Sequence, residues 1–261
     1  AYNTRDLVAN SLNRLCRPLR SRGAQIIVVD NASTDGVSQM ISEQFPEVDL
    51  ARSEHNRGFA GGNNLGLRRV RDDAAAVILL NSDVIAAPDT LVGLVEELHR
   101  RPEAGAISAG LMTPTGQPQA FAYGNDPTLS YLLRRALGTR LRLRPLHRWD
   151  VSEPIEVEWA SGACLCVRAA AIHQVGELDE RFFLYFEDND WCRRMRQAGW
   201  RIIYHPGYRV IHLGGASQPE RRQANNLYYQ SLIAFYAKHY GPLPTAILRA
   251  LLAVYRRTAA L

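Results

Sequence analysis

The chain has 261 residues, of which 46% are hydrophobic and 22% charged, and these values are typical of a globular protein with one sizeable core. No apolar run approaches the roughly 20 residues of a membrane-spanning helix and no signal peptide is visible, so we expect neither feature. The net charge of +5 indicates an anionic partner but does not identify it.

The four cysteines, Cys16, Cys164, Cys166 and Cys192, lack the paired spacing of a zinc site. Cys164 and Cys166 alternate along an expected strand, so both should lie on one face as buried thiols. This cysteine usage fits a reducing compartment, and we expect a cytoplasmic protein.

Helical spacing of apolar residues predicts a first helix over residues 6–19. A Rossmann-like domain that starts with a helix would lack its first strand, so we expect the sequence to be truncated at its N-terminus. Residues 25–29 then form a buried strand that ends at Asp30. There the carboxylate is placed to accept hydrogen bonds from a nucleotide base or ribose, although a simple turn aspartate explains its position equally well.

A glycine-rich stretch at residues 56–66 follows a short strand at residues 48–52. Its glycines allow the backbone to approach a ligand closely, and a helix that begins here would point its amides at an anion such as a diphosphate. The stretch matches neither the P-loop nor the GxGxxG pattern. A phosphate-recognising turn is therefore one interpretation that the pattern permits.

The most informative segment is the apolar run at residues 77–80, which ends in Asn81-Ser82-Asp83. We expect this run to be a fully buried strand of a parallel sheet, and ligands in open α/β sheets bind outside the carboxyl ends of the strands. Asp83 would meet a ligand there, and its hard oxygen atoms suit Mg²⁺ or Mn²⁺. The alternative is that Asp83 only caps the turn.

The α/β alternation continues through a helix that starts at Pro88 and a strand over residues 104–112, and is then lost over residues 113–150. We expect this segment to be a long excursion on the acceptor side. It contains a group of arginines with no acid among them, which indicates an anionic partner, with a solvated basic face as the alternative. These are Arg134, Arg135, Arg140, Arg142, Arg144 and Arg148.

Sheet structure resumes over residues 156–168, with a break at Ser161-Gly162, and a short helix at residues 169–175 leads to an aromatic-rich run. This run ends in the acids Glu187, Asp188 and Asp190. Burial raises the pKa of a carboxyl group, as a general base near neutral pH requires. Acids at a helix start also favour the helix dipole, but that effect alone does not explain three acids behind so many aromatics.

Two further strands are expected at residues 200–204 and 208–212, joined at Pro206-Gly207. His212 ends the second strand, beside a loop with two glycines. A lone histidine at a strand end is more often structural than a ligand.

Taken together, these segments resemble the inverting family 2 nucleotide-sugar glycosyltransferases of the GT-A fold, in their bacterial rhamnosyltransferase-like branch. The resemblance extends from the first residues to about residue 240. The segments that carry it are Tyr2-Asn3, Val29-Asp30-Asn31-Ala32-Ser33-Thr34-Asp35, Asn56-Arg57-Gly58-Phe59-Ala60-Gly61-Gly62-Asn63-Asn64-Leu65-Gly66, Leu80-Asn81-Ser82-Asp83, Trp159-Ala160-Ser161-Gly162-Ala163, residues 178–190 and His212-Leu213-Gly214-Gly215.

The resemblance implies an α/β fold of Rossmann-like GT-A type, with a mostly parallel central sheet flanked by helices and with C-terminal helices. It also implies a role for each matching residue. Asp188 would be the catalytic base with Glu187 in support, and Asp83 and His212 would bind a divalent metal, Mg²⁺ or Mn²⁺. Asn81 replaces the first acid of the family's DXD motif and leaves one carboxylate there. Donor binding would fall to Tyr2, Asn3, Asp30, Asn56, Gly58, Phe59, Gly61, Gly62, Asn63, Asn81, Ser82 and Asp83, and acceptor binding to Trp159, Ser161, Gly162 and Glu187.

The implied function is transfer of a rhamnose-like or other hexose from a dTDP- or UDP-linked donor to a saccharide or a polyprenyl-diphosphate-linked saccharide, in cell-surface polysaccharide synthesis. Two alternatives stay open: a catalytically inactive nucleotide-sugar-binding protein, and a sugar-phosphate nucleotidyltransferase. The latter usually has an N-terminal glycine-rich signature, which is not seen. A nucleic-acid partner is not expected, because it would not explain an acidic cluster behind aromatics.

We expect a glycosyltransferase domain over residues 1–240 and an amphipathic helical extension over residues 241–261. Apolar residues recur at helical spacing in this extension, with arginines between them, so the helix could lie on an anionic membrane without spanning it. The enzyme would then be peripheral on the inner face of the cell membrane. Alternatively, the apolar stripe packs on the catalytic domain or forms a homodimer. The residues are Leu243, Ile247, Leu248, Leu251, Leu252 and Tyr255, with Arg249, Arg256 and Arg257.

Overall fold

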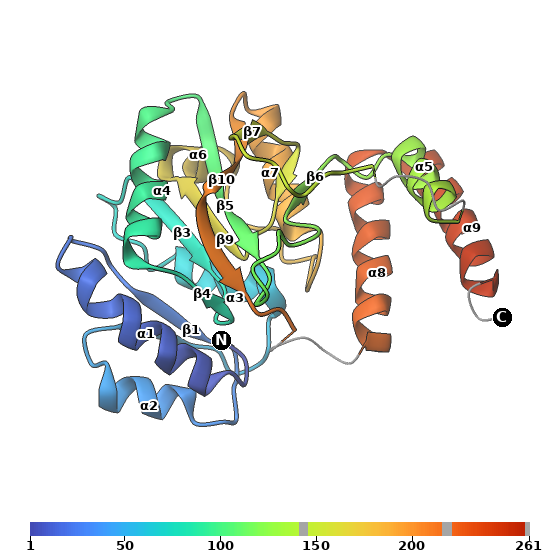
Figure 1. Ribbon diagram of the computed structural model, residues 1–261. Coiled ribbons are helices and arrows are strands. Elements are labelled where there is room, and N and C mark those ends of the chain that lie inside the picture. Colours follow the sequence, from blue (N-terminus) through green and yellow to red (C-terminus); the bar gives the residue numbers. More distant parts are fainter. Residues whose placement is uncertain (141–145, 216–220, 259–261) are drawn as a thin grey trace.

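The computed structural model describes residues 1–140, 146–215 and 221–258, so Arg142, Arg144 and the last residues of the predicted extension lie outside the described residues. Figure 1 shows a central sheet with helices around it and a separate group of helices, α5, α8 and α9, on one side. The elements in chain order are α1 Arg5–Arg20, β1 Ile27–Asp30, α2 Val37–Gln44, β2 Asp49–Arg52, α3 Gly58–Leu67, β3 Ala76–Leu80, β4 Val84–Ile85, α4 Pro88–Arg100, β5 Ala104–Met112, β6 Tyr123–Gly124, α5 Leu129–Arg140, β7 Ile155–Glu156, β8 Trp159–Ala160, β9 Cys164–Arg168, α6 Ala169–Val175, α7 Glu187–Gln197, β10 Arg201–His212, α8 Arg221–His239 and α9 Pro242–Thr258.

The central sheet has the order β3-β9-β5-β10-β4, and β7 also pairs with β10. Strands β5 and β10 are parallel, but β9 runs antiparallel to both of its neighbours, β3 and β5. The prediction of an α/β fold is confirmed, whereas the expectation of a mostly parallel sheet is corrected to a mixed one. The periodicity of apolar residues does not predict whether two strands pair parallel or antiparallel, because a buried strand has the same apolar pattern in both cases.

Strand β3 differs from its expected environment in a second way. It lies at one end of the sheet order, paired antiparallel with β9, and of its residues only Leu79 is fully buried. The expectation of a fully buried strand in a parallel sheet was therefore wrong, although the strand itself and its end before Asn81 are as predicted.

Strand β10 is one continuous strand where two were expected. The register against β5 shifts between His205 and Arg209, which is the irregularity of a β-bulge. Proline has no amide hydrogen to donate to a ladder, so Pro206 marks this interruption without ending the strand. Beyond the bulge the strand continues to His212 and carries this histidine to the sheet edge.

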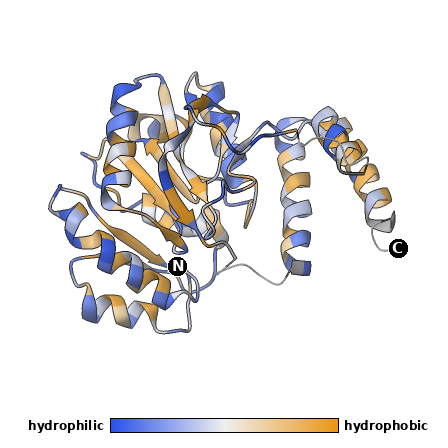
Figure 2. Ribbon diagram, in the orientation of Figure 1, coloured by the Kyte–Doolittle hydropathy of each residue, from blue (hydrophilic) through white to orange (hydrophobic). Residues whose placement is uncertain are grey.

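The main core lies around the central sheet, and Figure 2 shows the predominantly hydrophobic colouring of its strands. Cys164 and Cys166 are both buried within it, as predicted, and burial raises the pKa of the Cys164 thiol to about 12. A smaller core joins α1 and α2 to the parallel pair β1 and β2. Ala1 lies beside β1, since the Asn31 amide donates to its carbonyl oxygen at 2.8 Å.

A third core joins α5, α8 and α9 to the aromatic run before α7. Phe182 and Phe186 pack there with Leu232, Phe235 and Leu248. Helix α5 occupies part of the segment in which the α/β rhythm was expected to be lost, and α8 was not predicted. Within the described part of the chain, no helix is both long and apolar enough to cross a membrane.

Candidate active site

The antiparallel pairing of β3 with β9 brings two predicted site segments together at one edge of the sheet. Leu80, the last residue of β3, pairs with Cys164, the first residue of β9. The Asn81 amide then donates a 2.9 Å hydrogen bond to the carbonyl oxygen of Ala163. The Asn81-Ser82-Asp83 loop therefore lies beside the Ser161-Gly162 break, although some eighty residues separate them in sequence.

Asp83 and His212 meet at the same edge. His212 pairs with Val84 across β10 and β4, and its Nε2 lies 3.4 Å from Oδ1 of Asp83. On the other side of the ring, Nδ1 lies 3.0 Å from Oε1 of Gln119. If Nδ1 carries the proton and donates it to Gln119, the Nε2 lone pair is directed toward Asp83. The structure brings the two predicted metal ligands together, and their role as ligands stays a prediction.

The two side chains suit a divalent ion that the donor also helps to bind. Asp83 is buried, and carboxylate oxygen is a ligand of Mg²⁺ and Mn²⁺, while imidazole nitrogen is better suited to transition metals. In the described residues, no group of three or more His, Cys, Asp or Glu side chains could hold a metal. The remaining ligands would therefore come from water and from phosphate oxygens, as is usual for metals bound with nucleotide substrates.

The acidic cluster lies at the start of α7, after a tight reversal of the chain. Tyr185 and Phe186 both have left-handed backbone conformations, with φ of 70° and 66°. This conformation is costly for a bulky residue, at roughly 1–3 kcal/mol, and such strain is concentrated at functional sites. The reversal places Glu187 and Asp188 at the first two positions of the helix.

Glu187 and Asp188 differ in their electrostatic environment. Burial, followed by repulsion from Asp188, raises the pKa of Glu187 well above its usual value. No described residue donates a hydrogen bond to Oε2 of Glu187. Burial also raises the pKa of Asp188, to about 6, but backbone amides, that of Gly162 first, limit this shift. The pKa of about 6 leaves Asp188 mostly ionised near neutral pH, whereas burial favours the protonated form of Glu187.

The half-buried carboxylate of Asp188 faces the predicted acceptor segment. Its Oδ2 accepts a 3.2 Å hydrogen bond from the Gly162 amide, and its Oδ1 accepts one of 2.8 Å from the Asn189 amide. A Cβ atom at position 162 would lie 2.9 Å from the ring of Phe59, so only glycine fits here without displacement. Trp159 is half-buried in β8, the strand that ends directly before Ser161, and its ring nitrogen donates to the carbonyl oxygen of Asn125.

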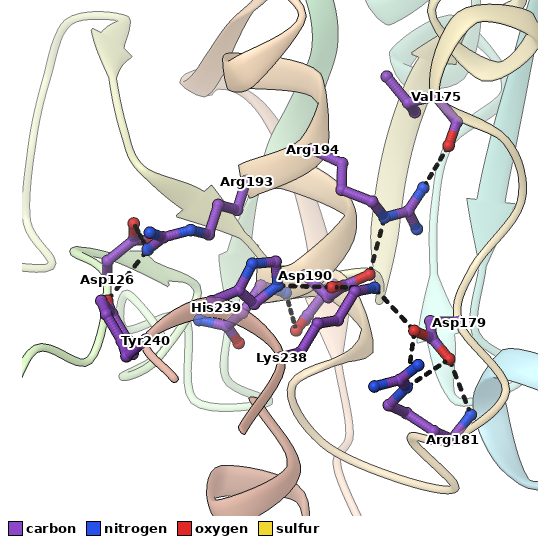
Figure 3. Close-up of polar contacts among 12 residues, drawn as sticks. Asp126, Val175, Asp179, Arg181, Asp190, Arg193, Arg194, Lys238, His239 and Tyr240 are labelled. Carbon is purple, nitrogen blue, oxygen red and sulfur yellow. Dashed lines mark hydrogen bonds and ion pairs between the residues drawn. The ribbon is translucent and has the colours of Figure 1, made fainter. Parts of the chain in front are cut away.

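Asp190, the third acid, has a different environment (Figure 3). It is fully buried, and its carboxylate lies 2.8 Å from Nε of Arg194, 2.6 Å from Nζ of Lys238 and 2.7 Å from Nε2 of His239. Burial alone would raise the pKa of Asp190, but hydrogen bonds from His239, Lys238 and Arg194 lower it to about 2. Such a carboxylate is too weak a base to take a proton near neutral pH. Lys238 also bonds Asp179 at 2.7 Å, so this cluster fixes the end of α8 to the start of α7.

The predicted donor residues near the N-terminus form a connected loop structure. Asp30 is buried, accepts hydrogen bonds from the Ser33 amide at 2.8 Å and from the Ser38 hydroxyl, and thereby shapes its own loop. Asn3 accepts a 2.8 Å bond from the Thr34 amide. Tyr2 is exposed beside them, and Thr4 donates to Ser82 at 3.1 Å, which connects this loop to the Asp83 loop. A surface hollow is lined by Asn3, Thr4, Arg5, Asp6, Leu7 and Asp35.

The glycine-rich turn forms the start of α3, but two of its amides are already used within the protein. The Gly58 amide donates to Asn56 at 2.9 Å, and the Phe59 amide donates to the carbonyl oxygen of Phe183 at 2.7 Å. A Cβ atom at Gly58 would lie 2.1 Å from that same oxygen. In this structure the turn therefore contacts the loop before the acidic cluster, and its role in donor binding stays a prediction. Gly61, Gly62 and Asn63 continue the helix, where Gly62 approaches Asn31 and Asn63 donates to the carbonyl oxygen of Phe59.

Comparison with known proteins identifies the family to which this chain belongs. The model of the family described as "Glycosyl transferase family 2" matches residues 1–142. N-acetylglucosaminyl-diphospho-decaprenol L-rhamnosyltransferase of Mycobacterium tuberculosis (strain ATCC 25618 / H37Rv) is 32% identical over 205 residues, which are 73% of this chain and 67% of the relative. The chain belongs to glycosyltransferase family 2. Rhamnosyltransferase WbbL of Escherichia coli (strain K12) is 25% identical over 194 residues, or 72% of each chain.

Comparison with solved structures supports the fold of this family 2 enzyme. Mannosyltransferase PcManGT from Pyrobaculum calidifontis, solved with GDP-Man and Mn²⁺, matches with a TM-score of 0.56 at 18% identity, over 100% of this chain and 79% of that one. At this identity the likeness shows the fold alone, and the predicted GT-A fold is confirmed. The protein is thus a glycosyltransferase of GT-A fold.

Several contacts that organise the family 2 site were missed from sequence. Asn64 belongs to the glycine-rich stretch that the resemblance assigns to the nucleotide and sugar, but its structural role was not predicted: it is buried and exchanges hydrogen bonds with the backbone of Leu178, at 2.9 and 3.1 Å, which positions the chain leading to the acidic cluster. Gln119 orients His212, and Lys238 and His239 bind Asp190. Their partners lie between 48 and 114 residues away in sequence, so no local pattern identifies them.

Proposed function

We propose that this glycosyltransferase moves rhamnose or a related hexose from a dTDP- or UDP-linked donor to a saccharide carried on polyprenyl diphosphate, with inversion at the anomeric carbon. The name of the M. tuberculosis relative gives such a lipid-linked saccharide as its acceptor, and the E. coli relative is also a rhamnosyltransferase. The product would belong to cell-surface polysaccharide synthesis.

The observation that carries the proposal is the unequal pair of carboxyl groups at the start of α7. A pKa of about 6 leaves Asp188 ionised at neutral pH and still basic enough to accept a proton. Burial, and then repulsion by Asp188, raises the pKa of Glu187 well above its usual value, which favours the neutral form of this side chain. This difference favours Asp188 as the base and Glu187 as a neutral group that supports it or contacts the acceptor.

The proposed reaction is a single displacement. Asp188 takes the proton of an acceptor hydroxyl group as the oxygen forms a bond to the anomeric carbon. The bond from that carbon to the donor phosphate breaks on the opposite face, and the nucleoside diphosphate leaves with its electron pair. Since Asp188 takes only a proton, no covalent enzyme intermediate is needed. Gly162, whose amide donates to this carboxylate, and the preceding Ser161 and Trp159 would contact the acceptor.

Donor binding would use the opposite side of the same sheet edge. Asp83 and His212 would hold Mg²⁺ or Mn²⁺, which when bound neutralises charge on the diphosphate. Asn81 and Ser82 would position the diphosphate beside them. Asp30, Asn3 and Tyr2 would bind the nucleoside, and the turn from Gly58 to Asn63 would border the sugar.

The enzyme would work as a peripheral protein at the inner face of the cell membrane, because a polyprenyl chain keeps the acceptor in the lipid. Residues 1–240 would form the catalytic domain, and residues 241–261 the extension that completes the group of C-terminal helices. This division follows the loop between α8 and α9.

A two-stage experiment tests the proposed function. In the first stage, dTDP-, UDP- and GDP-linked sugars are screened with Mn²⁺ or Mg²⁺ for thermal stabilisation, because a ligand that binds the folded state raises its apparent stability. In the second stage, each stabilising donor is incubated with a polyprenyl-diphosphate-linked saccharide, and NMR defines the anomeric configuration of the product.

The proposal predicts transfer with inversion, supported by a dTDP- or UDP-sugar. Binding without transfer to any lipid-linked saccharide would indicate an inactive nucleotide-sugar-binding protein. Release of pyrophosphate from a sugar phosphate and a nucleoside triphosphate would indicate a nucleotidyltransferase. A product with retained configuration would contradict the single displacement.

A further inference from the structure

Helix α9 has two apolar faces, and the protein covers only one of them. Leu248 is buried and Leu252 packs beside it against the core shared with α8. Leu243, Ile247 and Leu251, spaced four residues apart, remain 71%, 43% and 47% exposed. Figure 2 shows hydrophobic colouring on α9 at the outer side of the molecule. Val254 and Tyr255 extend the exposed stripe toward the end of the helix, at 61% and 52% exposure.

Helix α5 carries a similar exposed face beside it. Leu129 and Leu132 pack on the core shared with α8 and α9, whereas Leu133 and Leu137, one helical turn apart, are 52% and 47% exposed. The two exposed faces thus belong to helices that share one core, on the side of the molecule away from the sheet (Figure 1). Exposed apolar patches of this kind usually mark a site of interaction with another surface.

The charge around α5 and α9 indicates what kind of partner surface their exposed apolar faces bind. There is no Asp or Glu between residues 127 and 149, nor after residue 220, whereas both segments contain several arginines. Arg134 is exposed next to Leu133 on α5. Arginine side chains beside an apolar face can keep their charge among lipid headgroups while the face enters the acyl boundary.

The same charge disfavours a second copy of this chain as the partner. A two-fold dimer brings the same patch of each subunit together, so two acid-free, arginine-bearing patches would repel each other. An anionic leaflet instead complements the patch. We infer that α5 and α9 form a docking surface for an anionic membrane, through the stripe Leu243, Ile247, Leu251, Val254 and Tyr255 together with Leu133, Leu137 and Arg134.

This docking surface is joined to the catalytic helix. Helix α8 packs against α9 and ends at Lys238 and His239, which bind Asp190 two residues after the proposed base (Figure 3). The distance between the docked helices and Asp188 is therefore fixed, and the active site stays at a constant height above the lipid. The purpose of this arrangement rests on the proposed lipid-linked acceptor, but the binding itself does not require it.

Vesicle flotation of the full chain tests the inference without donor or acceptor. We expect binding to vesicles that contain phosphatidylglycerol, weaker binding to pure phosphatidylcholine, and release from the anionic vesicles at high salt. The double variant Leu243→Ser/Leu251→Ser should lose at least about tenfold in affinity, since two large apolar groups no longer enter the interface. The matched control is Ala246→Ser/Ala253→Ser on another exposed side of α9, which should bind like the parent.

A second pair of variants tests the charge. Arg134→Gln should weaken binding to anionic vesicles by about fivefold, the usual effect of one cation near an anionic leaflet. Arg14→Gln, which removes an exposed arginine from α1, changes the net charge equally and should have no effect. Equal effects of these two variants would show that only net charge acts, and would overturn the docking surface.

Absence of binding to anionic vesicles at low salt would also overturn the inference, as would unchanged binding of the Leu243→Ser/Leu251→Ser variant. If sedimentation shows that the parent is a dimer and this variant a monomer, the second copy occupies the stripe instead. Sugar transfer to a water-soluble, short-chain acceptor, measured without vesicles, tests the proposed function separately from the docking surface. Absence of transfer in this assay would contradict the proposed function and leave the vesicle result intact.

Discussion

The unequal environments of Asp188 and Glu187 make a sharp prediction for two conservative variants. Asp188→Asn keeps the size and hydrogen-bonding shape of the side chain but removes the base. Loss of a positioned base costs about 10²–10⁴ in rate, which corresponds to about 3–5 kcal/mol of transition-state stabilisation. We expect kcat to fall by this factor while donor affinity is nearly unchanged, because the proposed donor-binding residues, Asp83 among them, do not include Asp188.

Glu187→Gln is the matched control on the adjacent residue. Glutamine resembles protonated glutamic acid, the form that the raised pKa of Glu187 favours, so kcat should change by far less. The variant should also gain stability. A carboxyl group whose pKa is higher in the folded chain must take up a proton on folding, so its contribution to stability falls as pH rises from about 4.5 toward the folded value. Removing it relieves about 1.4 kcal/mol for each pH unit of that interval.

The pH dependence of the parent gives a further measurement on the same pair. With a pKa of about 6 for Asp188, the rate should fall as pH drops through 6. Since burial is the main cause of that value, Glu187→Gln should leave this acid limb in place. The assay is kcat against pH at saturating donor. Transfer by Asp188→Asn within tenfold of the parent would refute the assignment, and loss of activity in Glu187→Gln alone would exchange the two roles.

Three other variants test the surrounding structure. Asp83→Asn should abolish the extra thermal stabilisation that Mn²⁺ gives in the presence of UDP or dTDP, with a normal melting temperature for the unliganded protein; equal stabilisation of variant and parent would rule out Asp83 as a metal ligand. Lys238→Met removes one of the three hydrogen-bond partners of buried Asp190 and should lower the free energy of unfolding by about 1–3 kcal/mol, measured with urea, whereas an unchanged value would mean that Arg194 and His239 suffice. Gly58→Ala places a Cβ atom 2.1 Å from a carbonyl oxygen at a φ of 69° and should destabilise the fold by at least about 2 kcal/mol in the same assay, so a neutral result would show that the 183 loop moves freely.

The sequence predicts this fold well where the signals are local. The strand before Asn81, the helix from Pro88 to Arg100 and the start of α7 lie where apolar periodicity and turn residues place them. Strand direction was not accessible, because β9 inserts antiparallel between β3 and β5 through contacts made far along the chain. Helix α8 was missed although Tyr228, Leu232, Phe235 and Tyr236, which pack in the third core, recur along it at helical spacing.

In the candidate site, too, local patterns predict some residues and not others. Asp83, His212 and Asp188 were each recognisable from a strand end or a helix start, and from the resemblance to a family. Their orienting partners were not, since Gln119 lies 93 residues from His212 and Lys238 lies 48 from Asp190. A polar group that positions a ligand or a base needs only proximity in space, which leaves no pattern of spacing in the sequence.

One helix turn therefore contains carboxyl groups with opposite acid–base behaviour. Hydrogen bonds from His239, Lys238 and Arg194 lower the pKa of Asp190 to about 2, while burial raises the pKa values of Glu187 and Asp188 in the same turn. Burial of Glu187 and the left-handed Tyr185 and Phe186 both destabilise this reversal, and the Asp190 cluster is the contact best placed to oppose them. Lys238 and His239, two of the three partners of Asp190, come from α8, so a helix outside the central sheet holds the turn that contains Glu187 and Asp188.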